Sequence, residues 1–195
     1  MIALLVALAL SAPTSPAGKG SPSALPRVAF RTALGDFVVE VDAVRAPATA
    51  ANFLRYVDAG RYAGGAFHRT VTTAPDNQPR NAVKIDVVQA GAGPGADLPP
   101  VKLERTRDTG LAHVDGAISM ARDGPDTATS DFFVCVGAQP ALDFGGKRNP
   151  DGQGFAAFGR VVSGMEVIRR IHASPASGQS LSPPVKILGA TRLPP

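Results

Sequence analysis

The stretch "VAFRTALGDFVVEV", residues 28–41, alternates large apolar residues with polar or small ones. The large apolar side chains occupy every second position on either side of a Gly-Asp pair: Val28, Phe30, Phe37, Val39 and Val41. A period of two is typical of a β-strand with one buried face, and Gly and Asp favour turns. The stretch therefore predicts a β-hairpin that turns at Gly35 and Asp36.

The rest of the chain continues this β-rich pattern. Short apolar segments separated by Gly, Pro and Asp predict further strands at residues 66–71, 84–90, 117–121, 132–136, 155–162 and 185–190. In "FFVCV" two rings are adjacent, so either Phe132 or Phe133 must face away from the interior. The single Cys135 in the same segment is expected to be a packed, unreactive thiol.

Two segments have helical spacing instead. In residues 46–60, Pro47 suits a first helical turn and Gly60 a C-terminal cap. The apolar stripe of this helix is expected at Ala50, Phe53, Leu54 and Val57. The second helix is expected to begin with a capping box, in which Ser163 pairs with Glu166. Its inward face is expected at Met165, Ile168 and Ile171. Many short strands and two amphipathic helices predict a closed antiparallel barrel covered by helices.

Composition limits the classes of function. With 195 residues the chain can bury a sizeable core. Lys and Arg outnumber Asp and Glu by 20 to 16, but the excess is scattered and lacks interleaved aromatics, which disfavours nucleic-acid binding. A single cysteine rules out an internal disulfide framework and a multi-cysteine zinc site.

The N-terminus predicts export. "IALLVALAL", residues 2–10, is uninterrupted and apolar, which suits a secretory signal but is too short to span a bilayer. A basic start is missing, since the first positive side chain is Lys19. A buried N-terminal element and a membrane anchor are the alternatives. We expect a signal peptide at 1–17, a flexible linker at 18–26, one domain at 27–195, and a periplasmic or secreted protein without a membrane span.

Most kinds of site chemistry lack their parts. The histidines are too far apart in sequence to indicate a shared metal, and the aspartates between 115 and 131 do not have calcium-loop spacing: His68, His113, His172, Asp115, Asp123, Asp126 and Asp131. Two of these aspartates, 123 and 126, are expected to accept hydrogen bonds from backbone amides in a turn. No nucleophile elbow is present. We therefore expect no metal and no cofactor.

What remains is Arg69 in "GGAFHRTV", residues 64–71, and Gln89 after Val87 and Val88. An arginine beside apolar side chains is a solvated surface charge, half of an ion pair, or a group held against a ligand. Rotation about an X-Pro bond is a chemistry that needs only a hydrophobic pocket and a fixed hydrogen-bond donor.

Five motifs carry a resemblance to a known family: "AFHRTV" at 66–71, "VQAG" at 88–91, "GAISMARDGPDTATSDFFV" at 116–134, "ALDF" at 141–144 and "FAAFGRVVSGMEVIRRI" at 155–171. Together they resemble the cyclophilins, which are peptidyl-prolyl cis-trans isomerases, from about Val28 to Ala190. The resemblance implies an eight-stranded closed antiparallel β-barrel capped by two α-helices. It also implies a monomer without cofactor or metal that acts on proline-containing polypeptides and assists protein folding.

The resemblance also assigns the site. Arg69 matches the catalytic arginine and Gln89 the glutamine beside the substrate carbonyl. The substrate-binding positions are the ring at the base of the proline pocket, the leucine of its wall, two strand-end residues whose backbone contacts the residue before proline, an aromatic residue of the rim, and a further ring: Phe133, Leu142, Ala121, Arg122, Phe155 and Phe67, in that order.

This chain departs from the family's pattern around the same site. The connection from Arg69 to Gln89 is unusually long, contains "TTAPDNQPRNAVK", and is expected on the surface, where its partial deletion would cost little stability. Asp86-Val87 stands where the family has Phe-Met, and Ala141 stands where it often has Trp. Phe155 stands where the family has His or Tyr, and Asp131 where it commonly has Gln. The alternatives to an isomerase are a peptide-binding module that has lost most catalysis and an unrelated β-barrel ligand binder.

Overall fold

The computed structural model describes residues 25–194. The expected signal peptide at 1–17 and residues 18–24 of the expected linker lie outside the described residues. Within this range, no helix is long and apolar enough to cross a lipid bilayer.

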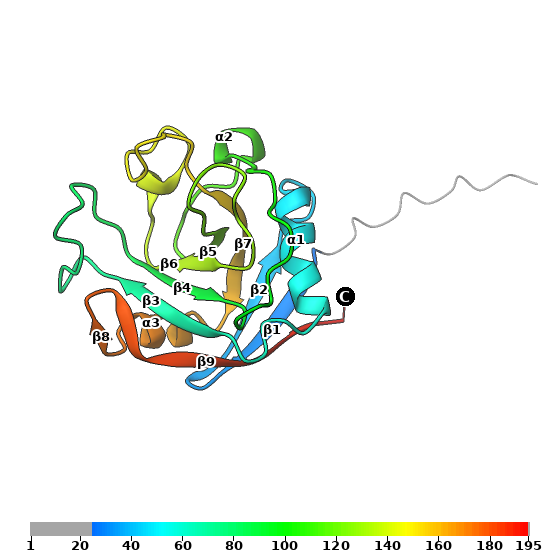
Figure 1. Ribbon diagram of the computed structural model, residues 1–195. Coiled ribbons are helices and arrows are strands. Elements are labelled where there is room, and N and C mark those ends of the chain that lie inside the picture. Colours follow the sequence, from blue (N-terminus) through cyan, green and yellow to red (C-terminus); the bar gives the residue numbers. More distant parts are fainter. Residues whose placement is uncertain (1–24, 195) are drawn as a thin grey trace, which may run out of the picture.

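Eight strands close into an antiparallel barrel, as expected (Figure 1). Around the barrel they follow the order β1 (Arg27–Thr32), β2 (Gly35–Val41), β7 (Ala156–Ser163), β5 (Ala117–Met120), β6 (Phe132–Cys135), β4 (Val87–Gly91), β3 (Ala66–Val71) and β9 (Ser180–Arg192). Pairing of β9 with β1 completes the ring. The two-residue strand β8 (Ala176–Ser177) pairs only with β9 and stays outside the ring.

The first hairpin turns earlier than expected. Gly35 pairs with Thr32, and Asp36 pairs with Arg31, so both predicted turn residues belong to the ladder. The Thr32 hydroxyl stabilises the tight turn, because it accepts a hydrogen bond from the Leu34 amide and donates one to the Gly35 carbonyl. Gly35 has a φ of +125°, a conformation that L side chains rarely adopt. The glycine is therefore needed where the strand resumes.

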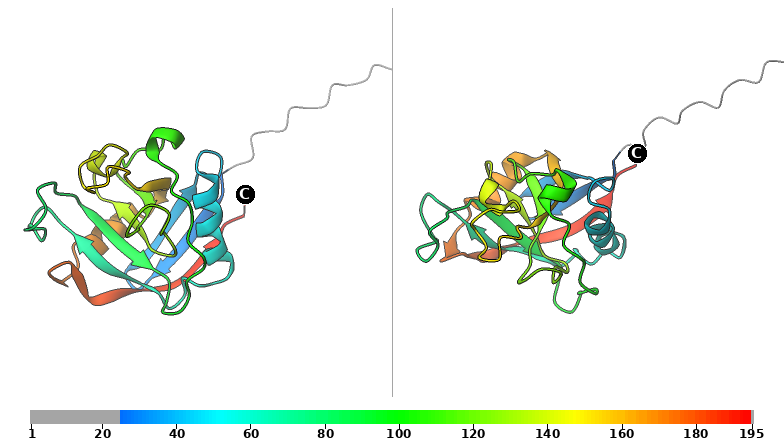
Figure 2. Two further views of the ribbon diagram at one scale, coloured as in Figure 1. Left: turned by 45° about the horizontal axis from the view of Figure 1, so that its top comes forward. Right: turned by 90° about the horizontal axis from the view of Figure 1, so that it is seen from above.

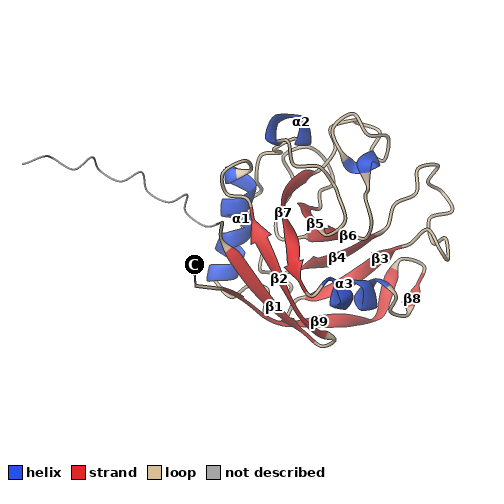
Figure 3. Ribbon diagram, turned by 180° about the vertical axis from the view of Figure 1, so that it is seen from behind, coloured by secondary structure: helices blue, strands red, loops and turns tan. Residues whose placement is uncertain are grey.

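Helices α1 (Pro47–Asp58) and α3 (Met165–His172) cover opposite openings of the barrel (Figures 1 and 3). Helix α1 begins at Pro47 as expected and buries the predicted apolar stripe. The capping box predicted for α3 is wrong, because Ser163 ends β7 and Gly164 is the N-cap, without a side-chain hydrogen bond. A Cβ at Gly164 would lie 2.5 Å from the Asp36 carbonyl oxygen, so the helix starts at the one residue that fits there.

The inward face of α3 also differs slightly from the expectation. Val167, Ile168 and Ile171 are buried, whereas Met165 is only partly buried. Two short helical turns, α2 (Thr106–Thr109) and the 3-10 helix η1 (Pro140–Leu142), were not predicted. Segments of three or four residues are too short to produce a helical period in the sequence.

The barrel wall separates two apolar clusters. The interior is filled largely by rings: Phe30, Phe37, Phe53, Tyr62, Phe67, Phe132 and Phe158. A smaller cluster lies apart from it and contains Val71, Ile85, Val87, Phe133, Cys135 and Leu142. Phe132 belongs to the interior and Phe133 to the smaller cluster, which confirms that the two adjacent rings face opposite ways. The smaller cluster forms the floor of the site described next.

Candidate active site

A cleft of about 570 Å³ lies against the barrel wall and is lined from β3, β4 and β6 and from the loops beside them. Every site residue expected from the sequence lines this cleft except Phe67: Arg69, Gln89, Ala121, Arg122, Phe133, Leu142 and Phe155. These residues come from six separate parts of the chain. The fold therefore assembles the predicted set at one place.

Phe67 lies inside the barrel instead. It is fully buried, and its ring packs edge-on against Phe37 and Phe132 with centroids 6.0 Å apart in both pairs. From this position it supports the wall behind the cleft and does not line it.

A β-bulge turns Arg69 outward. Phe67 pairs with Ala90 and Arg69 with Gln89, so the residue between them, His68, has no opposite number on β4. Without the bulge, Arg69 would share the inward face of Phe67, because residues two apart in a strand point the same way. The extra residue reverses this and places the guanidinium in the cleft. Sequence reasoning missed this bulge.

The guanidinium of Arg69 is held by two glutamines. Nη1 donates to Gln89 Oε1 at 3.1 Å, while Nε and Nη2 donate to Gln179 Oε1 at 3.0 and 2.6 Å. Gln89 in turn donates from Nε2 to Asp131 Oδ2 at 2.9 Å. Gln179 lies in the turn between β8 and β9, 110 positions from Arg69, and was missed. No local pattern links residues so far apart, so no sequence signal was available.

Arg69 is neither a solvated charge nor half of an ion pair. It is half-buried, and among residues 25–194 no carboxylate lies within ion-pair distance of it. Burial lowers the pKa of Arg69, but a guanidinium remains protonated at neutral pH. The cleft therefore contains a fixed cationic donor that no carboxylate neutralises.

The floor beside this donor is apolar and rigid. Phe133 meets Phe155 edge-on at 5.3 Å between ring centroids, and Leu142 is buried beside them. Behind Phe133 the ring of His113 is stacked at 5.8 Å. His113 is itself held by Asp143 Oδ1 at 2.7 Å and Ser119 Oγ at 3.0 Å. The buried histidine thus supports the floor, a role that the sequence did not indicate.

The rim is closed by Arg122, whose side chain is almost fully buried at 1% exposure. Its guanidinium donates to the Gly154 carbonyl and to Asp151, and it lies 5.1 Å from the centre of the Phe155 ring. The Arg122 side chain therefore braces the loop before β7 and the rim ring. Only its backbone remains for a bound peptide.

The described part of the chain shows no metal site, and its thiol and the aspartate Asp126 have structural surroundings. No three His, Cys, Asp or Glu side chains there lie close enough to hold a metal ion. Cys135 is buried, and burial raises the pKa of its thiol far above the ordinary value. The expectation that Asp123 and Asp126 bind amides of their own turn is wrong, because Asp126 accepts from the Leu103 amide in another loop. Within the turn, Thr127 Oγ1 accepts from the amides of Asp123 and Gly124 instead.

A family model, described as cyclophilin type peptidyl-prolyl cis-trans isomerase/CLD, matches residues 27–192. The chain belongs to this family. Relatives include peptidyl-prolyl cis-trans isomerase A of Dickeya dadantii, which is 36% identical over 172 residues, covering 88% of this chain and 82% of the relative. An Arabidopsis thaliana isomerase, CYP18-2, is also 36% identical, over 78% of this chain and 82% of its own length.

Solved cyclophilins share the fold. A crystal structure of a Cryptosporidium parvum cyclophilin-type isomerase matches with a TM-score of 0.66 at 19% identity, over 88% of this chain and 99% of that one. A second structure of that protein, determined in the presence of the dipeptide Ala-Pro, matches with a TM-score of 0.64 at 18% identity, over 87% of this chain and 99% of that one.

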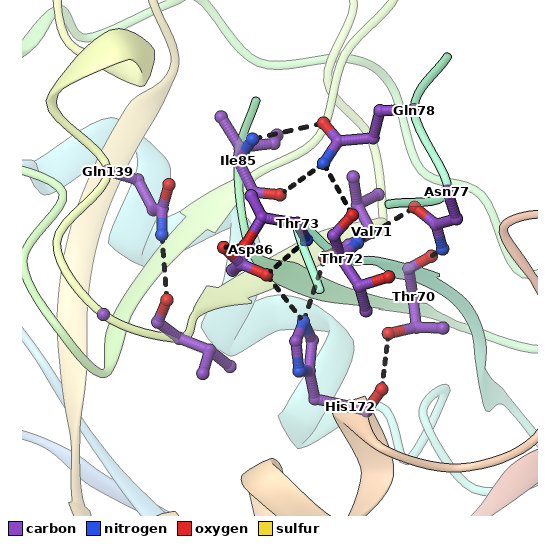
Figure 4. A network of polar contacts seen from close by, with 12 residues as sticks. Thr70, Val71, Thr72, Thr73, Asn77, Gln78, Ile85, Asp86, Gln139 and His172 are labelled. Atoms are coloured by element: carbon purple, nitrogen blue, oxygen red, sulfur yellow. Dashed lines mark hydrogen bonds and ion pairs between the residues drawn. The ribbon is translucent and has the colours of Figure 1, made fainter. Parts of the chain in front are cut away.

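The long connection between β3 and β4 extends well away from the barrel (Figure 2). Most of it is exposed, as expected, but Gln78 is only 1% exposed. The Gln78 amide donates to the carbonyls of Thr72 and Ile85 and accepts from the Ile85 amide (Figure 4). The connection is thus folded around one buried glutamine. We therefore expect a partial deletion of the connection to cost little stability only where it leaves Gln78, Thr72 and Ile85 in place.

The side chain of Asp86 turns away from the cleft. Its carboxylate accepts from the amide and hydroxyl of Thr73 at 2.8 and 2.7 Å, and one oxygen lies 3.7 Å from His172 Nε2 (Figure 4). Val87 lines the cleft instead. The carboxylate therefore fastens the base of the long connection and leaves the apolar floor uninterrupted.

Proposed function

We propose that this cleft is the active site at which the protein, a peptidyl-prolyl cis-trans isomerase, rotates X-Pro bonds of client polypeptides. Arg69 is the catalytic residue, and Gln89 lies beside the substrate carbonyl. The observation that carries the proposal is a guanidinium that two glutamines fix in a cleft with an apolar floor. Phe133 and Leu142 bind the proline ring, and the backbone at Ala121 and Arg122 receives the residue before proline.

The physics of the reaction suits this arrangement. Rotation about the peptide bond costs about 18–20 kcal/mol, because the amide has partial double-bond character. In the twisted transition state the lone pair returns to the prolyl nitrogen. A guanidinium hydrogen-bonded at the prolyl residue favours that state, and an apolar floor removes water that would favour the planar amide. One preorganised donor of this kind contributes about 2.7–4 kcal/mol, or roughly 100- to 1000-fold in rate. No covalent intermediate is required.

Removal of the donor tests the proposal. Arg69→Ala is expected to lower catalysed cis-to-trans conversion of a short X-Pro peptide by about 100-fold or more. Arg69→Lys should restore little, because an ammonium does not reproduce the planar fork. Circular dichroism checks that the variants fold, and Arg31→Ala, which removes an exposed arginine of β1 that does not line the cleft, is the matched control. If folded Arg69→Ala kept wild-type rates, the role of Arg69 would be wrong. If the wild type bound proline peptides without accelerating them, the binding-module alternative would replace the isomerase.

We also propose that the protein is exported, with residues 1–17 removed, and that it works as a monomer in the periplasm or outside the cell. The uninterrupted apolar run at residues 2–10 and the small residues that follow it support export. Mass spectrometry of natively expressed protein should find a shortened N-terminus, and an intact Met1 in the cytoplasm would contradict export. Sedimentation of the mature protein tests the monomer.

A further inference from the structure

A second guanidinium lines the same cleft. Arg148 belongs to the loop between η1 and β7, and its amide donates to the Ala141 carbonyl at 3.1 Å. Its Nη1 donates to Gln78 Oε1 at 2.8 Å and to the Val83 carbonyl at 2.6 Å. Both acceptors belong to the long connection between β3 and β4. Arg148 therefore joins the two long loops across one end of the cleft.

The positive charge of Arg148 has no carboxylate partner. Within residues 25–194, both acceptors of Arg148 are neutral amide oxygens, and no carboxylate lies within ion-pair distance. Nε and Nη2 have no protein acceptor in this range, yet no buried polar atom is left unsatisfied, so both donors remain open to the cleft or solvent. Burial and the nearby charge of Arg69 both lower the pKa of Arg148. Two unneutralised guanidinium groups thus act on the same space.

Two carboxylates line the cleft, and neither is within ion-pair distance of Arg148. Asp131 is held by Gln89 and lies 3.5 Å from His68 Nε2, and Asp123 is exposed in the turn that follows β5. Arg148 instead meets the connection that leaves β3 after Val71 and enters β4 at Val87. Since Val87 precedes Gln89 by two strand residues, the two ends are separated by roughly 7 Å along β4. Asp131 therefore lies beside Gln89, while neither Asp131 nor Asp123 is within ion-pair distance of Arg148.

We propose that Arg148 is a specificity residue that binds the side-chain carboxylate of an acidic residue directly following the proline. This inference rests on the proposed function, which places the residue before proline at Ala121 and Arg122. A peptide oriented in this way, with its ring over Phe133, carries its next residue toward Arg148. Its carboxylate accepts from the open Nε and Nη2, the bidentate geometry that guanidinium groups favour.

The test compares two peptides that differ only in charge, Ala-Ala-Pro-Glu-Ala and Ala-Ala-Pro-Gln-Ala, with acetyl and amide ends so that the Glu peptide carries the single carboxylate. NMR exchange spectroscopy measures isomerisation, and NMR titration measures affinity. For the wild type, kcat/KM and affinity should favour the Glu peptide by about tenfold, the value of one hydrogen bond to a charged group. The preference should shrink as salt is raised. A peptide with Glu before the proline should gain nothing.

Arg148→Gln should remove the preference for Glu, so that kcat/KM and affinity become equal for the Glu and Gln peptides. Lys147→Gln is the matched control, because it removes an exposed charge from the adjacent position, which does not line the cleft. Equal rates and affinities of the wild type for both peptides would overturn the inference and leave the proposed function intact. Turnover of neither peptide would instead contradict the proposed function, and the affinity ratio would still decide the role of Arg148.

Discussion

At the scale of the residue, the orientation of the Arg69 side chain depends on residues that are distant in the sequence or that act through strand pairing. The bulge at His68 sets the direction of its side chain, and Gln179 holds two of its donors. Gln179 is itself fixed, since its Nε2 donates to the Asn77 carbonyl and its own carbonyl accepts from the Thr70 amide. The contacts that preorganise the Arg69 donor thus extend from the turn between β8 and β9 to the long connection and β3.

Gln179→Ala is therefore expected to lower kcat by about tenfold with little change in KM, because a mobile donor loses part of its transition-state advantage. Gln179→Glu keeps the acceptor oxygen for Arg69 and should recover part of the loss. The backbone bond to Thr70 survives in both variants, so the turn should stay folded. Ser177→Ala, an exposed change in the preceding strand β8, serves as the control. A rise in KM alone would show that Gln179 acts on binding.

At the scale of the element, the long connection is a folded unit with a single buried polar centre. The Gln78 amide satisfies both backbone groups of Ile85 and the carbonyl of Thr72 (Figure 4). Its oxygen also accepts a hydrogen bond from Arg148. Asp86, Thr73 and His172 fasten its base to α3. The connection therefore presents ordered groups to the cleft.

Gln78→Ala is expected to destabilise the protein by at least about 2 kcal/mol, because each buried polar group left unpaired costs about 1–3 kcal/mol. For a domain of this size that corresponds to a fall in Tm of roughly 4–8 °C. Calorimetry on Gln78→Ala beside Arg80→Ala, an exposed residue of the same connection, measures the difference. If both variants lowered Tm by the same small amount, the hydrogen bonds of Gln78 would contribute nothing to stability.

At the scale of the whole molecule, ion pairs join neighbouring strands around the barrel. Glu40 on β2 pairs with Arg27 on β1 and Arg160 on β7. The hydrogen bond from Arg27 lowers the pKa of Glu40 most. Burial of Asp42 opposes its ionisation, but hydrogen bonds from the amide and guanidinium of Arg45 outweigh it, so its pKa is also lowered. Both carboxylates are therefore more acidic in the folded state than in the unfolded one.

Stability from such groups is present above the unfolded pKa, about 4 for Asp and Glu, and is lost as pH falls through the lower folded pKa. Urea unfolding should give similar free energies at pH 5.5 and 7 and a steep decline below about pH 4. Glu40→Gln should flatten that decline, at a cost of at most about 1 kcal/mol at pH 7, because its arginine partners are exposed. If the free energy of unfolding of Glu40→Gln fell below pH 4 as steeply as that of the wild type, Glu40 would not contribute to the acid sensitivity.

The sequence by itself determined the barrel strands, the terminus of α1 at Pro47, the opposite orientations of Phe132 and Phe133, and the family. These follow from local polarity patterns and motifs that persist whatever the distant chain does. It also grouped six of the cleft residues with Arg69, through resemblance. It did not place Phe67, whose inward direction only the barrel decides.

Only the tertiary structure decided the bulge at His68, the hold of Gln179 on Arg69, the cap at Gly164, and the meeting of Gln78 with Arg148. Each depends on hydrogen bonds or close contacts between residues far apart in the chain. Such pairs leave no period in the sequence, because periodicity records which face a side chain takes within one element. Which elements then meet, and in what register, is set by closing the barrel.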